Sequence, residues 1–192
     1  MRYAVLIFLL PAGLVLSGCT TTPKAKVNVG YYQVSGTTEK TIERQLSLRG
    51  PHIPGKGRAL AAARIAIEQR VQVAEAPGWC RVADAQINIR ADVTLPQWKQ
   101  RASASKELRR KWDNFAAYAK AHEEVHIRIA EKYSAELERK LESIPAQSDC
   151  KSVSKIVSIV SKDVVGQMNK AQDKFDADEQ KRLALLSRRA ES

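Results

Sequence analysis

The chain has 192 residues, of which 44% are hydrophobic and 28% charged, and its formal net charge at pH 7 is +11. About 165 residues follow the leader and tether described below, which is enough for one domain with a substantial core and too few for two. A positive surplus can indicate a nucleic-acid partner, but the export signal argues against one. Anionic lipid headgroups or envelope polymers are better electrostatic partners, although we expect most of the charges on solvated helix faces.

Residues 1–18 have the layout of a lipoprotein signal peptide. Arg2 supplies a positive start, residues 4–16 form an almost unbroken apolar run, and small residues lead to Cys19. The run is shorter than the roughly 20 apolar residues that a membrane-spanning helix needs. The letters Leu16-Ser17-Gly18-Cys19 resemble a bacterial lipobox, which implies acylation of Cys19 and cleavage just before it. The alternative is an ordinary signal peptide that a cysteine follows by chance.

A lipid on Cys19 would anchor a soluble domain to a membrane of the cell envelope. Thr20 follows the cysteine instead of an aspartate, and by resemblance to Gram-negative lipoproteins this favours the outer membrane, with the domain facing the periplasm. Residues 19–26, rich in threonine, are expected to form a tether.

Two cysteines remain in the exported part of the chain, Cys80 and Cys150. In an oxidising compartment such a pair forms a disulfide more often than two free thiols. We therefore predict a structural disulfide between them.

The first half of the domain is predicted to be rich in β-structure. An extended stretch at 27–34 is followed by a short helix at 37–48 and a Gly/Pro loop at 52–57. Residues 65–73 and 83–95 alternate between apolar and polar side chains, as strands with one buried face do. The Pro77-Gly78 turn between them indicates an antiparallel pair, which Leu95-Pro96 should end.

The second half is predicted to be helical. Residues 106–144 contain neither glycine nor proline, and their apolar residues recur every three or four positions, so they form one helix or two with a subtle break. A last helix begins near Lys151, and the charged tail at 177–192 should fray. The predicted fold class is α+β: a small antiparallel sheet in the N-terminal half packs on long, zincin-like helices in the C-terminal half, within one domain at 27–176.

The pattern His122-Glu123-Glu124-Val125-His126 is a His-Glu-x-x-His motif on the long predicted helix. Histidines at i and i+4 lie one turn apart and can converge on one Zn²⁺ ion. Both occupy places in the apolar stripe of the helix, so we expect them to point inward. Glu123 can act as the general base that takes a proton from the attacking water. The alternative is two satisfied core histidines beside a solvated glutamate, but burying two imidazoles without partners costs free energy.

The residues alone leave the third metal ligand open. No Glu, Asp or His follows the motif at the spacing of the common extended motifs. The candidates are acidic residues near the end of the last helix and a histidine in the Gly/Pro loop, namely Asp173, Asp176, Glu179 and His52.

Most of the chain after the tether resembles the domain-of-unknown-function 922 family, a bacterial group described as predicted secreted zinc-dependent proteases. The resemblance implies a metallopeptidase fold. Members carry an aromatic-Asp pair near the C-terminus followed shortly by a His that could be the third ligand; Phe175-Asp176 matches the pair, but no His follows it here, so Asp176 or Glu179 would take that place. The matching stretches are Tyr31-Tyr32-Gln33-Val34-Ser35-Gly36, Gly50-Pro51, Cys80-Arg81-Val82, Val93-Thr94-Leu95-Pro96-Gln97-Trp98, Trp112, Phe115, His122-Glu123-Glu124-Val125-His126 and Ile129-Ala130-Glu131.

The sequence therefore supports two hypotheses of different classes. The first is a lipid-anchored zinc metallopeptidase that hydrolyses peptide bonds of envelope proteins or peptides; cleavage of peptidoglycan peptides would use the same chemistry. The second is a non-catalytic envelope lipoprotein with a degenerate or structural zinc site, which binds anionic envelope components. The intact Glu123 favours the first hypothesis, and the missing family histidine favours the second.

Overall fold

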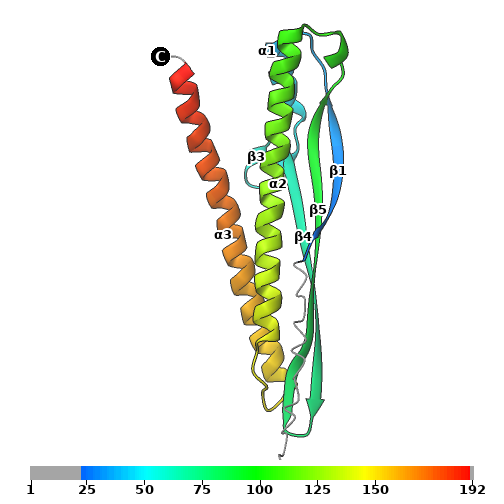
Figure 1. Cartoon of the computed structure of the whole chain (residues 1–192), viewed down its shortest axis with the longest axis vertical. Coiled ribbons are helices and arrows are strands. Elements are labelled where there is room, and N and C mark those ends of the chain that lie inside the picture. Colours follow the sequence, from blue (N-terminus) through cyan, green and yellow to red (C-terminus); the bar gives the residue numbers. More distant parts are fainter. Residues whose placement is uncertain (1–22, 191–192) are drawn as a thin grey trace, which may run out of the picture.

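The computed structural model describes residues 23–190. The predicted signal peptide, Cys19 and most of the tether lie outside the described residues. The predicted α+β class is confirmed, with a small sheet in the N-terminal half and long helices in the C-terminal half (Figure 1). In chain order the elements are β1 (Ala25–Val34), α1 (Glu39–Arg49), β2 (His52–Ile53), β3 (Gly57–Arg58), β4 (Ala62–Ala76), β5 (Trp79–Trp98), a 3₁₀ turn (Arg101–Ser103), α2 (Lys106–Glu142) and α3 (Cys150–Ala190).

The main sheet has the strand order β1-β5-β4. The β4–β5 pair is the predicted antiparallel hairpin, but β1 pairs with β5 in parallel, so the sheet is mixed and the prediction of a wholly antiparallel sheet is wrong in this respect. A parallel partner is possible because α1, β2, β3 and β4 separate the two strands in sequence and give the chain room to return. The predicted loop at 52–57 contains the small β2–β3 hairpin.

Strand β5 is longer and less regular than its sequence pattern indicates. Its odd-numbered residues are buried from Ala85 to Leu95, as predicted, but Ala83 is exposed. Ala83 is the extra residue of a β-bulge between Asp84 and Val82, which shifts the alternation by one position. The strand also continues past Pro96. The β4 partner ends opposite Thr94, so at the proline β5 has only β1 as a neighbour, and a missing N–H is tolerated there.

Helix α2 is a single helix of 37 residues, with Ser105 as its N-cap. Helix α3 has 41 residues, and the chain stays helical to Ala190. The prediction that the tail frays after Asp176 is therefore wrong. Ion pairs at helical spacing, such as Glu179 with Arg182 at 2.7 Å, contribute to this last part of the helix. No helix within residues 23–190 combines the length and hydropathy that a membrane span requires.

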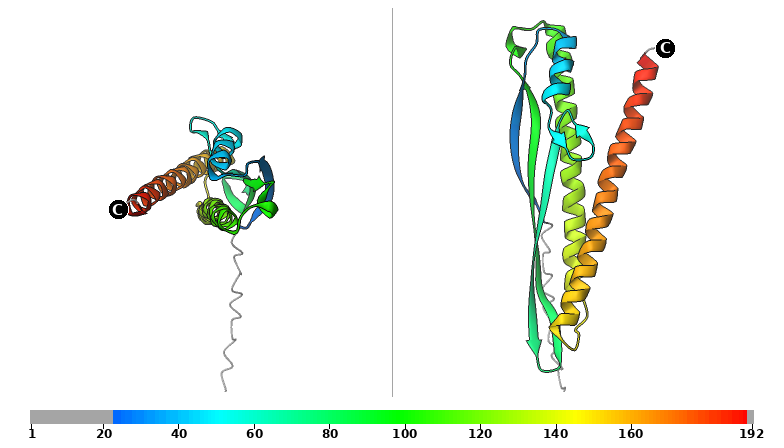
Figure 2. Two further views of the ribbon diagram at one scale, coloured as in Figure 1. Left: turned by 90° about the horizontal axis from the view of Figure 1, so that it is seen from above. Right: turned by 180° about the vertical axis from the view of Figure 1, so that it is seen from behind.

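The molecule is elongated, with α2 lying along one face of the sheet and α3 running beside α2 (Figures 1 and 2). The two long helices are close together near the α2–α3 connection and separate toward the C-terminus. Near the connection, Leu137 and Leu141 of α2 form a buried cluster with Val153 and Val164 of α3 and the first part of β5. This cluster fixes the start of α3 against the rest of the domain.

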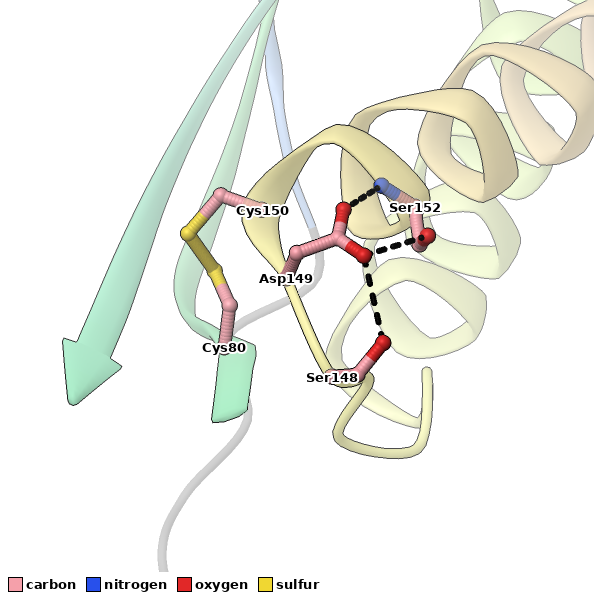
Figure 3. The surroundings of a disulfide bond; sticks show 5 residues. All are labelled: Cys80, Ser148, Asp149, Cys150 and Ser152. Carbon is pink, nitrogen blue, oxygen red and sulfur yellow. Dashed lines mark hydrogen bonds between the residues drawn. A yellow bond between two sulfur atoms is a disulfide. The ribbon is translucent and has the colours of Figure 1, made fainter. Parts of the chain in front are cut away.

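The predicted disulfide between Cys80 and Cys150 is confirmed (Figure 3). It joins the start of β5 to the start of α3. Beside it the backbones of Cys80 and Gln147 exchange two hydrogen bonds of 2.8 Å. The carboxylate of Asp149 caps α3 by accepting the backbone N–H of Ser152 at 2.8 Å. The disulfide, the two backbone hydrogen bonds and the Asp149 cap together set where α3 begins and in which direction it runs.

Replacing Cys80 and Cys150 together with serine should lower the free energy of unfolding by about 4 kcal/mol in the chain-entropy model, because the disulfide links positions 70 residues apart. Urea unfolding of the parent and the double variant measures this difference. The parent unfolded with a reductant serves as the control and should match the double variant. Equal stability of the oxidised parent and the double variant would contradict the structural role of the bond.

Candidate metal centre

The His-Glu-x-x-His motif lies near the middle of α2, and its three functional side chains do not share one environment. Glu123 is the buried one, with 5% of its surface exposed, and it lies on the side of α2 that faces the sheet. The side chains of His122 and His126 are partly exposed, at 21% and 14%, and contact α3. The expectation that the histidines fill the core stripe of α2 is therefore wrong, because that stripe passes through Glu123 and Ile127.

The two histidines converge with one carboxylate from α3. The Nε2 atoms of His122 and His126 are 3.1 Å apart. Oδ1 of Asp176 lies 3.0 Å from Nε2 of His126 and 3.4 Å from Nε2 of His122. One ligand atom from each of these residues lies within 4.8 Å of the other two, which is close enough to hold a metal ion. Asp176, named from the sequence as the tentative third ligand, is thus the candidate that the fold brings to the histidines.

The other candidates for the third ligand are engaged elsewhere or lie apart from this group. Asp173 binds Lys56 at 2.8 Å. Glu179 accepts a hydrogen bond of 2.8 Å from the hydroxyl of Tyr118. His52 is in β2, where its exposed side chain lines the same cleft without joining the group. Glu179 also pairs with Arg182, which together with Tyr118 lowers the pKa of Glu179 to about 2.

Gln172, which the sequence analysis did not single out, sets the tautomer of His126. Its amide nitrogen donates to the backbone carbonyl of His126 at 3.0 Å, and a carbonyl can only accept. The amide oxygen of Gln172 must therefore be the atom 2.6 Å from Nδ1 of His126, and this nitrogen must carry the proton. In the neutral ring Nε2 is then unprotonated and directed at Asp176 and His122, which is the state that a metal ligand needs.

Packing holds both imidazoles in place, and it favours the neutral form of His122. The ring of Phe175 lies 4.8 Å from the ring of His122 and 5.1 Å from that of His126, measured between centroids. Burial, and then the neighbouring His126, lower the pKa of His122. A neutral imidazole is the form that binds metal ions.

Glu123 is held beside this group by the edge of the sheet. Burial raises the pKa of its carboxyl, and a hydrogen bond from the backbone N–H of Ala63, in β4, partly offsets this effect. A carboxyl whose pKa is raised toward neutrality is better suited to accept and return a proton than a solvated one.

One open cleft of about 690 Å³ is lined by the motif residues and by Asp176, that is, by His122, Glu123, His126 and Asp176. Its volume is in the range of small-molecule binding sites. The cleft lies between the β2–β3 hairpin, the start of β4, the middle of α2 and the second half of α3. Two imidazoles and a carboxylate are a donor set that fits a divalent transition metal. The arrangement can therefore hold a metal ion beside a buried carboxylate that is able to move a proton.

Asp176→Asn should weaken zinc binding by more than about a hundredfold, since loss of a direct ligand should exceed the 10–100-fold cost of losing an outer partner. Competition with a chromophoric chelator measures the affinity. Glu179→Gln is the matched control and should bind zinc like the parent. The reverse result, with Glu179→Gln impaired and Asp176→Asn unaffected, would exclude Asp176 as a ligand.

Gln172→Leu should weaken zinc binding by about 10–100-fold, because His126 loses the acceptor that keeps its proton on Nδ1. The same chelator competition applies. Gln167→Leu changes an amide on the same helix that pairs with Asp163 and serves as the control. Unchanged affinity in Gln172→Leu would show that the tautomer does not depend on this contact.

Comparison with known proteins bears out the resemblance noted from the sequence. Residues 29–182 match the model of a family described as "Bacterial protein of unknown function (DUF922)". Searches of curated proteins and of solved structures gave no match. The matched region contains the whole His122–His126 motif and Asp176, and it covers most of the chain. The protein therefore belongs to the DUF922 family.

Proposed function

We propose that this protein is a zinc metallopeptidase of the cell envelope, anchored by a lipid on Cys19 and facing the periplasm from the outer membrane. Its substrates would be peptide bonds of envelope proteins or peptides. The observation that carries the proposal is the convergence of His122, His126 and Asp176 in a cleft that also contains the buried Glu123. A structural metal site would not require this fourth residue.

The ligands in this proposal are Nε2 of His122, Nε2 of His126 and a carboxylate oxygen of Asp176. Three protein ligands are typical of catalytic zinc sites, whereas structural sites use four. Zinc bound there would supply Lewis-acid polarisation of the scissile carbonyl and lower the pKa of a water. Gln172 orients the ring of His126 through Nδ1, and Phe175 packs against both imidazoles.

Glu123 would move the protons. Its buried carboxylate would accept a proton from the attacking water and then donate it to the leaving amine. Burial favours the protonated intermediate stage, since it raises the pKa of the carboxyl, while the N–H of Ala63 fixes the orientation of the carboxylate. The burial of the carboxyl and its orientation both result from the packing of Glu123 against β4.

A non-catalytic lipoprotein remains the alternative function. It would use its net positive charge to bind anionic envelope components and retain a metal only for stability. Against it, a buried carboxylate beside the metal ligands costs free energy and has no purpose in a structural site.

Glu123→Gln should bind zinc like the parent and lose peptide cleavage by a factor of 100 or more, because the amide cannot accept the proton of the water. Cleavage is measured on a mixture of fluorogenic peptides and on envelope protein extract, and bound zinc is counted per chain. Glu124→Gln is the matched control, since Glu124 is exposed and pairs with Lys120. Cleavage by Glu123→Gln at the parent rate would refute the assignment. A parent that binds zinc but cleaves nothing in either assay would favour the non-catalytic alternative.

A further inference from the structure

Lys56 contacts the same carboxylate that completes the metal group. Its ammonium lies 3.2 Å from Oδ2 of Asp176 and 2.8 Å from Oδ1 of Asp173. The other oxygen of Asp176, Oδ1, faces Nε2 of His126. The two oxygens of one carboxylate are thus divided between Lys56 on one side and the histidines on the other.

The β2–β3 hairpin carries Lys56 in its turn. Gly55 and Gly57 flank it with φ values of +76° and +86°, which favour glycine, and nothing lies within 4 Å of where their Cβ atoms would be. These glycines are therefore required by the backbone conformation and not by lack of space. At the base, Arg58 donates to the carbonyl of Gly50 at 2.8 Å, which ties the hairpin to the end of α1.

We propose that Lys56 is a positioning residue of the metal centre. Its ammonium holds Oδ2 of Asp176 and thereby keeps Oδ1 directed at His122 and His126. The proposal rests on the proposed function only in requiring that these residues bind a metal ion.

Stability alone does not account for the contact. The side chain of Lys56 is 54% exposed, and exposed ion pairs contribute little to folding. Asp173 and Asp176 are one turn apart on α3, so both carboxylates can bind the ammonium of Lys56 at the same time. Two partners restrict its position more than one would. Their hydrogen bonds raise the pKa of Lys56, which therefore stays charged.

The sign of the effect separates positioning from simple electrostatics. A positive charge close to a cation site repels the cation, so removing the charge alone should tighten metal binding. Loss of a group that orients a ligand should instead weaken it, by about 10–100-fold. The two explanations of the Lys56 contact thus predict opposite changes in affinity.

The test compares zinc affinity in the full chain for the parent, Lys56→Met, Lys56→Arg and Lys120→Met, by competition with a chromophoric chelator. Lys120→Met removes an equal charge from α2 without touching Asp176, since Lys120 is exposed and pairs with Glu124 at 3.3 Å. We expect Lys56→Met to weaken zinc binding about 10–100-fold, Lys56→Arg to restore most of the affinity, and Lys120→Met to leave it unchanged or slightly tighter.

A second readout is the visible spectrum of the Co²⁺-loaded protein, which reports ligand geometry without requiring any substrate. Lys56→Met should change the spectrum, and Lys56→Arg should resemble the parent. Equal urea midpoints for the variants would show that folding is not the cause. Zinc binding by Lys56→Met at or above the parent affinity, with an unchanged Co²⁺ spectrum, would overturn the proposal and leave the metal site standing. A parent that binds no zinc would overturn both the role of Lys56 and the metal site.

Discussion

The antiparallel packing of α2 against α3 determines which metal ligands meet, and the Cys80–Cys150 bond fixes the start of α3 to β5. Each turn toward the start of α2 meets a turn further along α3, so that His126 contacts Gln172 and Tyr118 contacts Glu179. At 1.5 Å per residue, Asp176 lies roughly 39 Å from the first residue of α3. A slip of one residue would rotate its carboxylate by about 100° away from the histidines. The convergence of the metal ligands therefore depends on the packing and the disulfide near the α2–α3 connection, far from the site itself.

Features that depend on neighbouring residues in the sequence were predictable, and features that depend on the path of the chain were not. The alternation in β5 and the uninterrupted pattern of α2 are local, and both elements formed there, although β5 extends beyond the predicted bounds at both ends. The parallel direction of β1 was missed because a strand's residues do not specify which way its partner runs. The continuation of α3 beyond Asp176 was missed because the high charge of this segment was interpreted as a sign of fraying. Contacts such as Tyr118 with Glu179, which arise only after folding, help to hold this part of the helix.

The same division applies within the site. Spacing alone placed His122 and His126 on adjacent turns and identified Glu123 beside them. The choice among Asp173, Asp176 and Glu179 required the register of α3 against α2, because all three are acidic residues on neighbouring turns of one helix. The burial of Glu123 followed from the sheet, because β4 packs against the side of α2 that carries this residue. Gln172 and Lys56 could not be recognised, since neither has a ligating side chain and each acts through a hydrogen bond to a distant element.

The proton positions on the two histidines give a physical reason for a cation at this place. In a neutral His126 ring with its proton on Nδ1 against Gln172, Nε2 is a bare acceptor 3.1 Å from Nε2 of His122. If His122 is protonated on Nε2, it can donate to that acceptor, but its buried Nδ1, which has no hydrogen-bond partner within residues 23–190, becomes an unsatisfied acceptor. If it is protonated on Nδ1, two bare nitrogens and the carboxylate of Asp176 converge and repel one another. A metal ion bound between them would remove this repulsion, so metal binding and the stability of the α2–α3 pairing should be thermodynamically linked.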